Sequence, residues 1–165
     1  MSGESKAYIG LGGNLGNAAE TVRTARRAIG AIPGVRELAF SSLYRSAPMG
    51  PSDQPDYVNA VMAVATSLAP QALLHALQRI ERIHGRVRTG ERWGPRTLDL
   101  DLLLYDDLVL DTETLRLPHP GIAEREFVLY PLAEIAPDLD IPDRGPLREL
   151  VRNCPLRGLS VIAHD

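Results

Sequence analysis

Two aspartates stand one residue apart in the segment GPRTLDLDLLLYDD, residues 94–107. The segment is short and apolar and begins with Gly and Pro, which predicts a buried β-strand. Side chains alternate between the two faces of a strand, so Asp99 and Asp101 share one face, about 6–7 Å apart along the chain. Carboxylates suit Mg²⁺, and two on one face could hold two ions that clamp phosphoryl oxygens. The alternative is a solvated pair, or one salt-bridged to Arg96.

Four arginines crowd the segment just before this strand: Arg86, Arg88, Arg92 and Arg96. Glycines separate them, and Trp93, the one tryptophan of the chain, lies among them. Guanidinium groups suit bidentate contacts with phosphate, and the glycines would let a loop close over a ligand. Taken alone, the segment could be an ordinary solvated loop. Beside two carboxylates it favours a magnesium–polyphosphate substrate, with acids for the metal and arginines for the developing charge.

Tyr57 and Asn59 are two residues apart in the apolar run YVNAVMAVATS, so on a strand they share a face. A ring beside an amide can stack a flat heterocycle and read its edge by hydrogen bonds. The alternative is a tyrosine at a strand end with an exposed asparagine. His119 lies between prolines in LPHPG, which could aim its imidazole, although a lone histidine is more often structural.

The glycine-rich segment GLGGNLG, residues 10–16, has neither the lysine of a P-loop nor the spacing of a dinucleotide fingerprint. We interpret it as a tight turn. A nucleotide site in this chain must therefore be built in another way.

The elements that must position these residues follow the order strand, helix, strand, strand, helix, strand. The expected ranges are 7–13, 17–32, 36–46, 57–67, 70–84 and the aspartate strand. This order predicts a ferredoxin-like α+β fold, with a mostly antiparallel sheet and helices on one face. Prolines break the chain beyond residue 107, where short helices are expected in VLYPLAEIAP and PLRELVRN.

Length and composition predict one domain spanning residues 1–165. The chain is 44% hydrophobic, and its net charge of −3 argues against a protein built to bind nucleic acid. The single cysteine, Cys154, allows no disulfide within the chain and no zinc site. We find no signal peptide and no membrane span, and we expect a cytoplasmic monomer.

Several of these stretches closely resemble the 6-hydroxymethyl-7,8-dihydropterin pyrophosphokinase family of folate biosynthesis. They are GPSDQPDYVNAV, RVRTGERWGPRT, GPRTLDLDLLLYDD and LPHPGIAEREFVLYPLAEIAPD, and the resemblance runs from about residue 7 to 152. It implies a ferredoxin-like fold and transfer of the pyrophosphoryl group of ATP to the pterin hydroxymethyl group, with release of AMP. ATP as co-substrate and two Mg²⁺ ions are implied as well.

The resemblance also implies roles for matching positions. Asp99 and Asp101 match the ligands of the two Mg²⁺ ions, and Asp101 also orients or deprotonates the pterin hydroxyl. The matching catalytic residues are Arg86, Arg96 and Asp101. The matching pterin-binding residues are Tyr57, Asn59, Trp93 and Phe127. The matching ATP-binding residues are Glu81, Arg88, Arg96, His119 and Arg125.

Two other classes remain open on the residues alone. A nucleotide-sugar transferase could use the same Asp-x-Asp pattern to bind a metal–diphosphate, and AMP among the products would distinguish the two. An RNA-binding module could use a ferredoxin-like sheet, but it would need a basic sheet face with several exposed aromatics. The acidic balance and the small number of aromatics argue against that reading.

Overall fold

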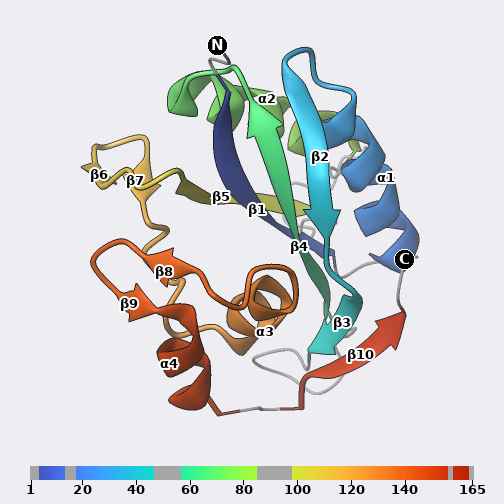
Figure 1. Cartoon of the computed structure of the whole chain (residues 1–165). Coiled ribbons are helices and arrows are strands. Elements are labelled where there is room, and N and C mark those ends of the chain that lie inside the picture. The colour runs from blue at the N-terminus through green and yellow to red at the C-terminus, as the bar shows by residue number, and fades with distance from the viewer. Residues whose placement is uncertain (1–3, 14–17, 47–56, 85–97, 156–157, 164–165) are drawn as a thin grey trace.

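The structure is a computed structural model that describes residues 4–13, 18–46, 57–84, 98–155 and 158–163. Its N-terminal part follows the predicted order, with the second predicted strand divided in two (Figure 1). The elements of this part are β1 (Ser5–Gly13), α1 (Ala18–Gly30), β2 (Val35–Phe40), β3 (Leu43–Ser46), β4 (Tyr57–Thr66), α2 (Pro70–His84) and β5 (Asp99–Tyr105). The C-terminal elements are β6 (Leu110–Asp111), β7 (Arg116–Leu117), α3 (Glu126–Ile135), β8 (Asp140–Ile141), β9 (Gly145–Pro146), α4 (Leu147–Arg152) and β10 (Ser160–Ala163).

One antiparallel sheet organises the described residues. Its strands lie in the order β10-β3-β4-β1-β5, and β2 also pairs with β4. All of β1 pairs with β4, from Ser5 opposite Thr66 to Gly13 opposite Val58. On its other side β4 pairs with β3 near its start and with β2 near its end. The predicted ferredoxin-like α+β class is confirmed, and β5, which carries the two aspartates, is an edge strand.

The single strand expected over residues 36–46 is wrong, because the chain breaks at Ser41 and Ser42. The Ser41 backbone N–H donates to the Val61 carbonyl, and its hydroxyl accepts from the Val61 N–H, each at 2.9 Å. Ser42 turns away and donates its N–H and hydroxyl to the Glu134 carboxylate of α3, at 3.0 and 2.8 Å. Serine hydroxyls compete in this way with the backbone hydrogen bonds between strands. The hydrogen bonds of Ser42 to Glu134, called here the Ser42–Glu134 clamp, therefore separate the two short strands.

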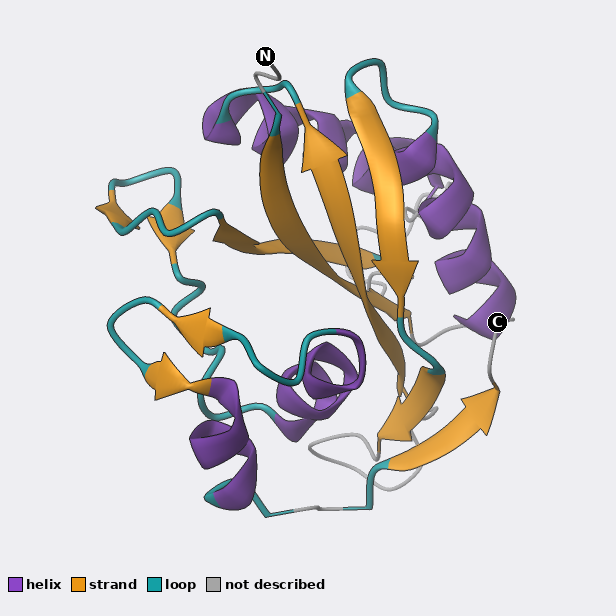
Figure 2. Ribbon diagram, in the orientation of Figure 1, coloured by secondary structure: helices purple, strands orange, loops and turns teal. Residues whose placement is uncertain are grey.

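Helices cover both faces of the sheet (Figure 2), and an apolar cluster lies between the sheet and the helices on each side. One face carries α1 and α2 against Ile9, Leu11 and other residues of β1, β4 and β5. The other carries α3 and α4 against Tyr8, Val61 and Leu103. The expectation of helices on one face therefore holds for α1 and α2 but not for α3. The order of elements up to residue 107 does not predict helices on the second face. These helices, α3 and α4, come from the proline-rich segment that follows.

The two long helices bury the stripes that their spacing predicts, with one exception. Val22 and Ile29 of α1, and Leu73 and Leu77 of α2, are fully buried. Ile83 follows the same helical spacing after Ile80 but is 57% exposed, because it lies in the last turn of α2. Among the described residues no helix is both long enough and apolar enough to cross a membrane.

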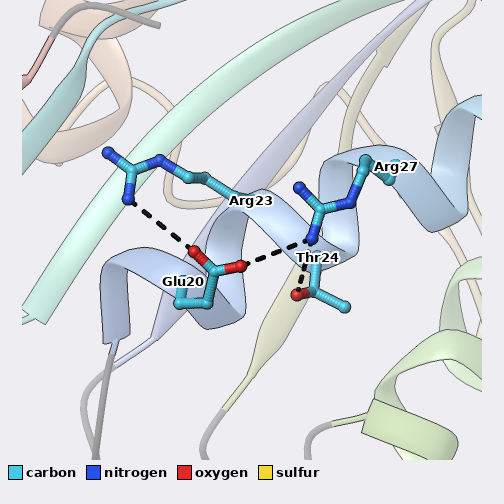
Figure 3. Close-up of polar contacts among 4 residues, drawn as sticks. All are labelled: Glu20, Arg23, Thr24 and Arg27. Atoms are coloured by element: carbon cyan, nitrogen blue, oxygen red, sulfur yellow. Dashed lines mark hydrogen bonds and ion pairs between the residues drawn. The ribbon is translucent and has the colours of Figure 1, made fainter.

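The outer surface of α1 is held by weak ionic contacts. Glu20 lies between two arginines, 3.9 Å from Arg23 and 3.4 Å from Arg27, and Arg27 also donates to the Thr24 hydroxyl at 3.3 Å (Figure 3). Such exposed pairs contribute about 0.2–0.5 kcal/mol each to an isolated helix. This face therefore adds little to the stability that the buried stripe provides.

Candidate active site

A cavity of about 1000 Å³ opens on the sheet face opposite α1 and α2. Four strands and the start of α3 supply its walls. The lining residues are Gly10, Leu11, Gly12, Ser46, Tyr57, Asn59, Ala60, Asp99, Asp101, Glu124, Arg125, Glu126, Phe127 and Val128. The structure describes eight of the candidate positions selected from the sequence. Six of them line the cavity, and His119 and Glu81 are not among its lining residues.

The two aspartates share one face of β5, as the strand period predicts. Asp99 and Asp101 line the cavity, while Leu100 between them is buried in the core on the α1–α2 side. In the register of the sheet, Asp101 lies opposite Gly10 and Asp99 opposite Gly12. Cross-strand neighbours share a face, so each carboxylate stands beside a residue with no side chain. Neither glycine adds a side chain beside these carboxylates, and other residues approach closely in their place: a Cβ at Gly10 would lie 3.5 Å from Leu103, and one at Gly12 would lie 3.1 Å from the Asn59 amide.

This pairing corrects the interpretation of residues 10–13 as part of a turn. β1 continues through Gly13 and remains hydrogen-bonded between β4 and β5. Glycine weakens an isolated strand, but pairing on both sides overrides that preference. Alternating glycines in a strand are themselves the signal that sequence reasoning missed, because they mark a face against which something must pack closely.

His119 reaches the aspartates from the turn that follows β7. Its Nε2 lies 3.8 Å from Asp101 Oδ1, and its Nδ1 accepts a hydrogen bond from the Gly121 N–H at 3.1 Å. The His119 backbone N–H donates to the Leu103 carbonyl at 3.0 Å, which ties the turn to β5. Burial lowers the pKa of His119; Asp101 opposes this shift and Arg125 adds to it. A neutral ring that accepts at Nδ1 carries its proton on Nε2, facing Asp101.

Arg125 and Phe127 enter the cavity at the start of α3. Arg125 is the N-cap residue of this helix, and its carbonyl accepts the N–H groups of Val128 and Leu129 at 3.0 and 2.9 Å. Its guanidinium carbon lies 5.9 Å from the centre of the Phe127 ring, within the range of a cation–π contact. The helix start thus places a cation and an aromatic ring side by side on the wall opposite the sheet.

Tyr57 and Asn59 line the cavity from β4, on the face that the strand period predicts. Asn59 is nearly buried, and its Oδ1 accepts a hydrogen bond from the Ser46 hydroxyl at 2.9 Å. Ser46 lies on β3 opposite Tyr57 in the register. The asparagine is therefore held by a second buried polar side chain, and the alternative of a merely exposed asparagine is wrong. Sequence reasoning did not select Ser46, because its contact depends on the pairing of β3 with β4.

Glu81 approaches the aspartate strand from the opposite side. It lies on α2, and its carboxylate accepts a hydrogen bond from the Leu100 backbone N–H at 2.8 Å. The edge of β5 would otherwise present this N–H to solvent. Glu81 thus supports the strand at the residue between the two aspartates; it does not line the cavity, and its expected contact with ATP remains a prediction.

Five of the expected site residues lie outside the described residues. They are Arg86, Arg88, Arg92, Trp93 and Arg96, all from the segment before β5. Their expected roles remain predictions.

The two carboxylates of the cavity suit Mg²⁺ only if other ligands of the ion come from outside the described side chains. Among the described residues, no group of three or more His, Cys, Asp or Glu side chains could hold a metal ion. Asp99 and Asp101 offer two carboxylates on an accessible face. Mg²⁺ is commonly bound by one or two carboxylates together with substrate phosphates and water, rather than by an all-protein cage. The pair therefore suits an ion that arrives with a phosphorylated ligand.

Comparison with known proteins identifies the family. A model of the 7,8-dihydro-6-hydroxymethylpterin-pyrophosphokinase family matches residues 8–137, most of the chain and nearly all of the cavity wall. The chain belongs to this family. The family match includes both aspartates, His119, Arg125 and Phe127.

Curated relatives agree with this assignment. The chain is 50% identical over 154 residues to a 2-amino-4-hydroxy-6-hydroxymethyldihydropteridine pyrophosphokinase of Pseudomonas aeruginosa, covering 93% of this chain and 94% of the relative. It is 49% identical over 146 residues to the protein of that name in Haemophilus influenzae, covering 88% and 91%. It is also 42% identical to the folic acid synthesis protein fol1 of Schizosaccharomyces pombe, of which it spans only 21%.

Solved structures support the fold. The wild-type HPPK-DHPS of Plasmodium falciparum matches with a TM-score of 0.70 at 14% identity, over 90% of this chain and 41% of that one. The chain thus spans less than half of this larger protein. At this identity the likeness speaks for the fold alone, and it agrees with the ferredoxin-like α+β architecture.

Proposed function

We propose that the chain performs the reaction of its family at the cavity above β1, β4 and β5. It is an ATP-dependent pyrophosphokinase of folate biosynthesis, which transfers the pyrophosphoryl group of ATP to the hydroxymethyl group of 6-hydroxymethyl-7,8-dihydropterin. The observation that carries the assignment of the site is the placement of Asp99 and Asp101 on one face, opposite Gly12 and Gly10. Two carboxylates beside two bare backbone positions suit a large, highly charged ligand.

Asp99 and Asp101 would hold two Mg²⁺ ions, which when bound neutralise charge on the phosphates of ATP. The hydroxyl oxygen of the pterin forms a bond to the β-phosphorus of ATP, the bond from that phosphorus to the α-phosphate bridging oxygen breaks, and AMP leaves. Asp101 accepts a hydrogen bond from the attacking hydroxyl and takes its proton. Nothing in this route needs a covalent enzyme intermediate, so positioning and electrostatics lower the barrier.

Tyr57, Asn59 and Phe127 form the pterin subsite. The ring of Phe127 at the start of α3 and the side chains of β4 face one cavity from opposite walls, which supports stacking of a flat heterocycle between them. The Asn59 amide supplies the polar contact that reads the edge of the ring. Trp93 completes this subsite from the segment before β5.

The nucleotide lies on the side of His119 and Arg125. His119 offers an Nε2 proton next to Asp101, and Arg125 adds a fixed positive charge to the same wall. Arg86 and Arg96 contact the transferred phosphates and speed the chemical step, while Arg88 and Glu81 support the binding of ATP. We further propose that residues 1–165 act as one pyrophosphokinase domain, as a monomer in the cytoplasm.

The direct test is to incubate the protein with Mg·ATP and 6-hydroxymethyl-7,8-dihydropterin and to follow AMP and the pterin diphosphate by chromatography. We expect both products in equal amounts, and neither when the pterin is left out. Release of ADP instead of AMP, or transfer only to a sugar acceptor, would contradict the proposal. Omission of Mg²⁺ with added chelator should abolish product formation.

A further inference from the structure

Gly121 and Arg125 make an unusually close contact in the turn before α3. A Cβ placed on Gly121 would lie 2.6 Å from Arg125 Nε, 2.8 Å from Cζ and 3.1 Å from Nη2. Real Cβ atoms do not approach other heavy atoms below 3.0 Å, so the guanidinium lies directly on the bare Cα of Gly121. Any larger residue at this position must displace the arginine.

The contact depends on space, not on backbone conformation. The described glycines with positive φ are Gly34, Gly145 and Gly158, and Gly121 is not among them. An alanine could therefore adopt the backbone of Gly121 without strain. The atoms it would meet belong to the far end of a flexible side chain, which can move at little cost to the fold.

The same glycine also orients His119. Its backbone N–H donates to His119 Nδ1 at 3.1 Å, and this bond directs Nε2 toward Asp101. The Gly121 carbonyl accepts the Glu124 N–H at 3.2 Å, and this turn leads directly to Arg125. One residue thus holds the imidazole through its amide and the guanidinium through its missing side chain.

Within the described part of the chain no carboxylate forms an ion pair with Arg125, although Glu124 and Glu126 flank it in the sequence. The guanidinium lies on the cavity wall, with the Phe127 ring 5.9 Å away. A planar cation in this position has donors available for phosphate oxygens.

We propose that Gly121 is a positioning residue for nucleotide binding, because its bare Cα seats the Arg125 guanidinium beside His119 on the phosphate side of the cavity. The inference rests on the proposed function. A Cβ at position 121 would push the guanidinium away by on the order of 1 Å, a misplacement that can cost up to about a hundredfold in rate. A Gly121→Ala substitution keeps the backbone N–H that holds His119, so its effect would come through Arg125, with little change in stability.

The test is a double-mutant cycle of Gly121→Ala and Arg125→Ala, with steady-state kinetics for both substrates. We expect Gly121→Ala to lower kcat/KM for Mg·ATP by about tenfold in the wild-type background and by less than about twofold when Arg125 is already alanine. The KM for the pterin and the Tm should stay near wild-type values. Gly30→Ala is the matched control, since nothing lies within 4 Å of a Cβ at that helix end.

Each other outcome overturns the inference. Wild-type kinetics in Gly121→Ala would show that the contact of the Arg125 guanidinium with Gly121 has no function. Equal losses in both backgrounds, or a large fall in Tm, would show that Gly121 supports the turn and not the arginine. If wild-type protein releases no AMP with the pterin, the proposed function fails; binding of Mg·ATP by calorimetry then still decides whether Gly121 acts through Arg125, and equal affinities of Gly121→Ala and wild type would refute it.

Discussion

Over residues 9–12 of β1 and 99–102 of β5, the two faces of the sheet differ in chemistry although the same strands make both. On the side of α1 and α2, Ile9, Leu11 and Leu100 are buried in a continuous apolar core. On the other side, Gly10 of β1 and Asp101 of β5, which alternate with these apolar residues along the strands, face the cavity. The strand period of two places most of the apolar side chains of this stretch on one face and the glycines and carboxylates on the other, although Leu11 also borders the cavity.

This difference shows how an open site can stand on a stable sheet. The core face provides burial, at about 25 cal/mol per Å² of apolar surface removed from water. The cavity face contributes little of this burial, because glycines and carboxylates have little apolar area to bury. Changes on one face should therefore alter stability, and changes on the other should alter activity.

Removal of an aspartate carboxylate should have the largest effect. We expect Asp101→Ala, and Asp99→Ala in the same way, to lower kcat by on the order of a thousandfold or more, because charge on the phosphates is no longer compensated. The Tm should change little, since the Asp101 side chain is 43% exposed. The rate of AMP release measures the change in kcat, and thermal unfolding measures the change in Tm. Near-normal turnover in Asp101→Ala would refute the metal assignment.

The opposite face should respond in the opposite way. Ile9→Ala removes a side chain that is 0% exposed in the α1–α2 core, and we expect it to lower the free energy of unfolding by about 2–5 kcal/mol. At a temperature where the variant remains folded, its kcat should stay within a few-fold of wild type. Urea unfolding followed by circular dichroism measures the first quantity. A loss of activity without a loss of stability would remove the proposed division between the faces.

The sequence predicted the parts of this division that depend on local periodicity. The shared face of Asp99 and Asp101, the apolar stripes of α1 and α2 and the α+β class all follow from spacing within one element. Contacts between distant segments could not be predicted in this way. The Ser42–Glu134 clamp joins residues 92 positions apart, and the seat of Arg125 on Gly121 depends on the local path of an irregular turn.

The resemblance to a family reached further than periodicity did. It selected Phe127 and Arg125, whose position opposite the sheet no pattern in the chain indicates. It did not reach the residues that hold these side chains in place. Ser46 could be selected only once the register of β3 and β4 was known, whereas Gly12 could have been selected from the alternating glycines of the strand.

A methyl group at position 12 should sharpen the comparison, because it changes the cavity face by one carbon. The Cβ of Gly12→Ala would lie 3.1 Å from Asn59 Nδ2, closer than ordinary van der Waals contact, and should displace the amide. We expect the KM for the pterin to rise by about tenfold while the KM for ATP changes little. Each KM is measured by titrating one substrate while the other is kept at a saturating concentration. An unchanged pterin KM would mean that the Asn59 amide does not read the substrate.

Two buried serines allow a smaller and more selective test. Ser46 donates to the Asn59 side chain in the cavity, whereas the Ser41 hydroxyl accepts from the Val61 backbone N–H away from it. Ser46→Ala should raise the pterin KM several-fold, and Ser46→Thr should restore it. Ser41→Ala should instead lower stability by about 1 kcal/mol with an unchanged pterin KM. Equal kinetic effects of the two alanine variants would show that Ser46 acts only on stability.

Ionic contacts on the outer surface should give the smallest effects, and pH should separate them. Arg26 donates to both oxygens of Glu37 at 2.8 and 2.9 Å, while Glu20 makes longer contacts with Arg23 and Arg27. The hydrogen bond and charge of Arg26 lower the pKa of Glu37 despite partial burial. A carboxyl with a lowered folded-state pKa stabilises the protein above its unfolded-state pKa and loses that contribution as the pH falls through the folded-state value.

Glu37→Gln should therefore lower the free energy of unfolding by less than about 1 kcal/mol at neutral pH. The difference from wild type should shrink as the pH falls below the ordinary carboxyl value of 4.5. Glu20→Gln is the control, and its effect should be smaller at every pH because its contacts are longer and its side chain is 52% exposed. Urea unfolding of the three proteins across this pH range gives the result. A difference that persists at acidic pH would mean that packing, such as that of Arg26 on the Phe40 ring, and not the charge of Glu37, holds α1 to β2.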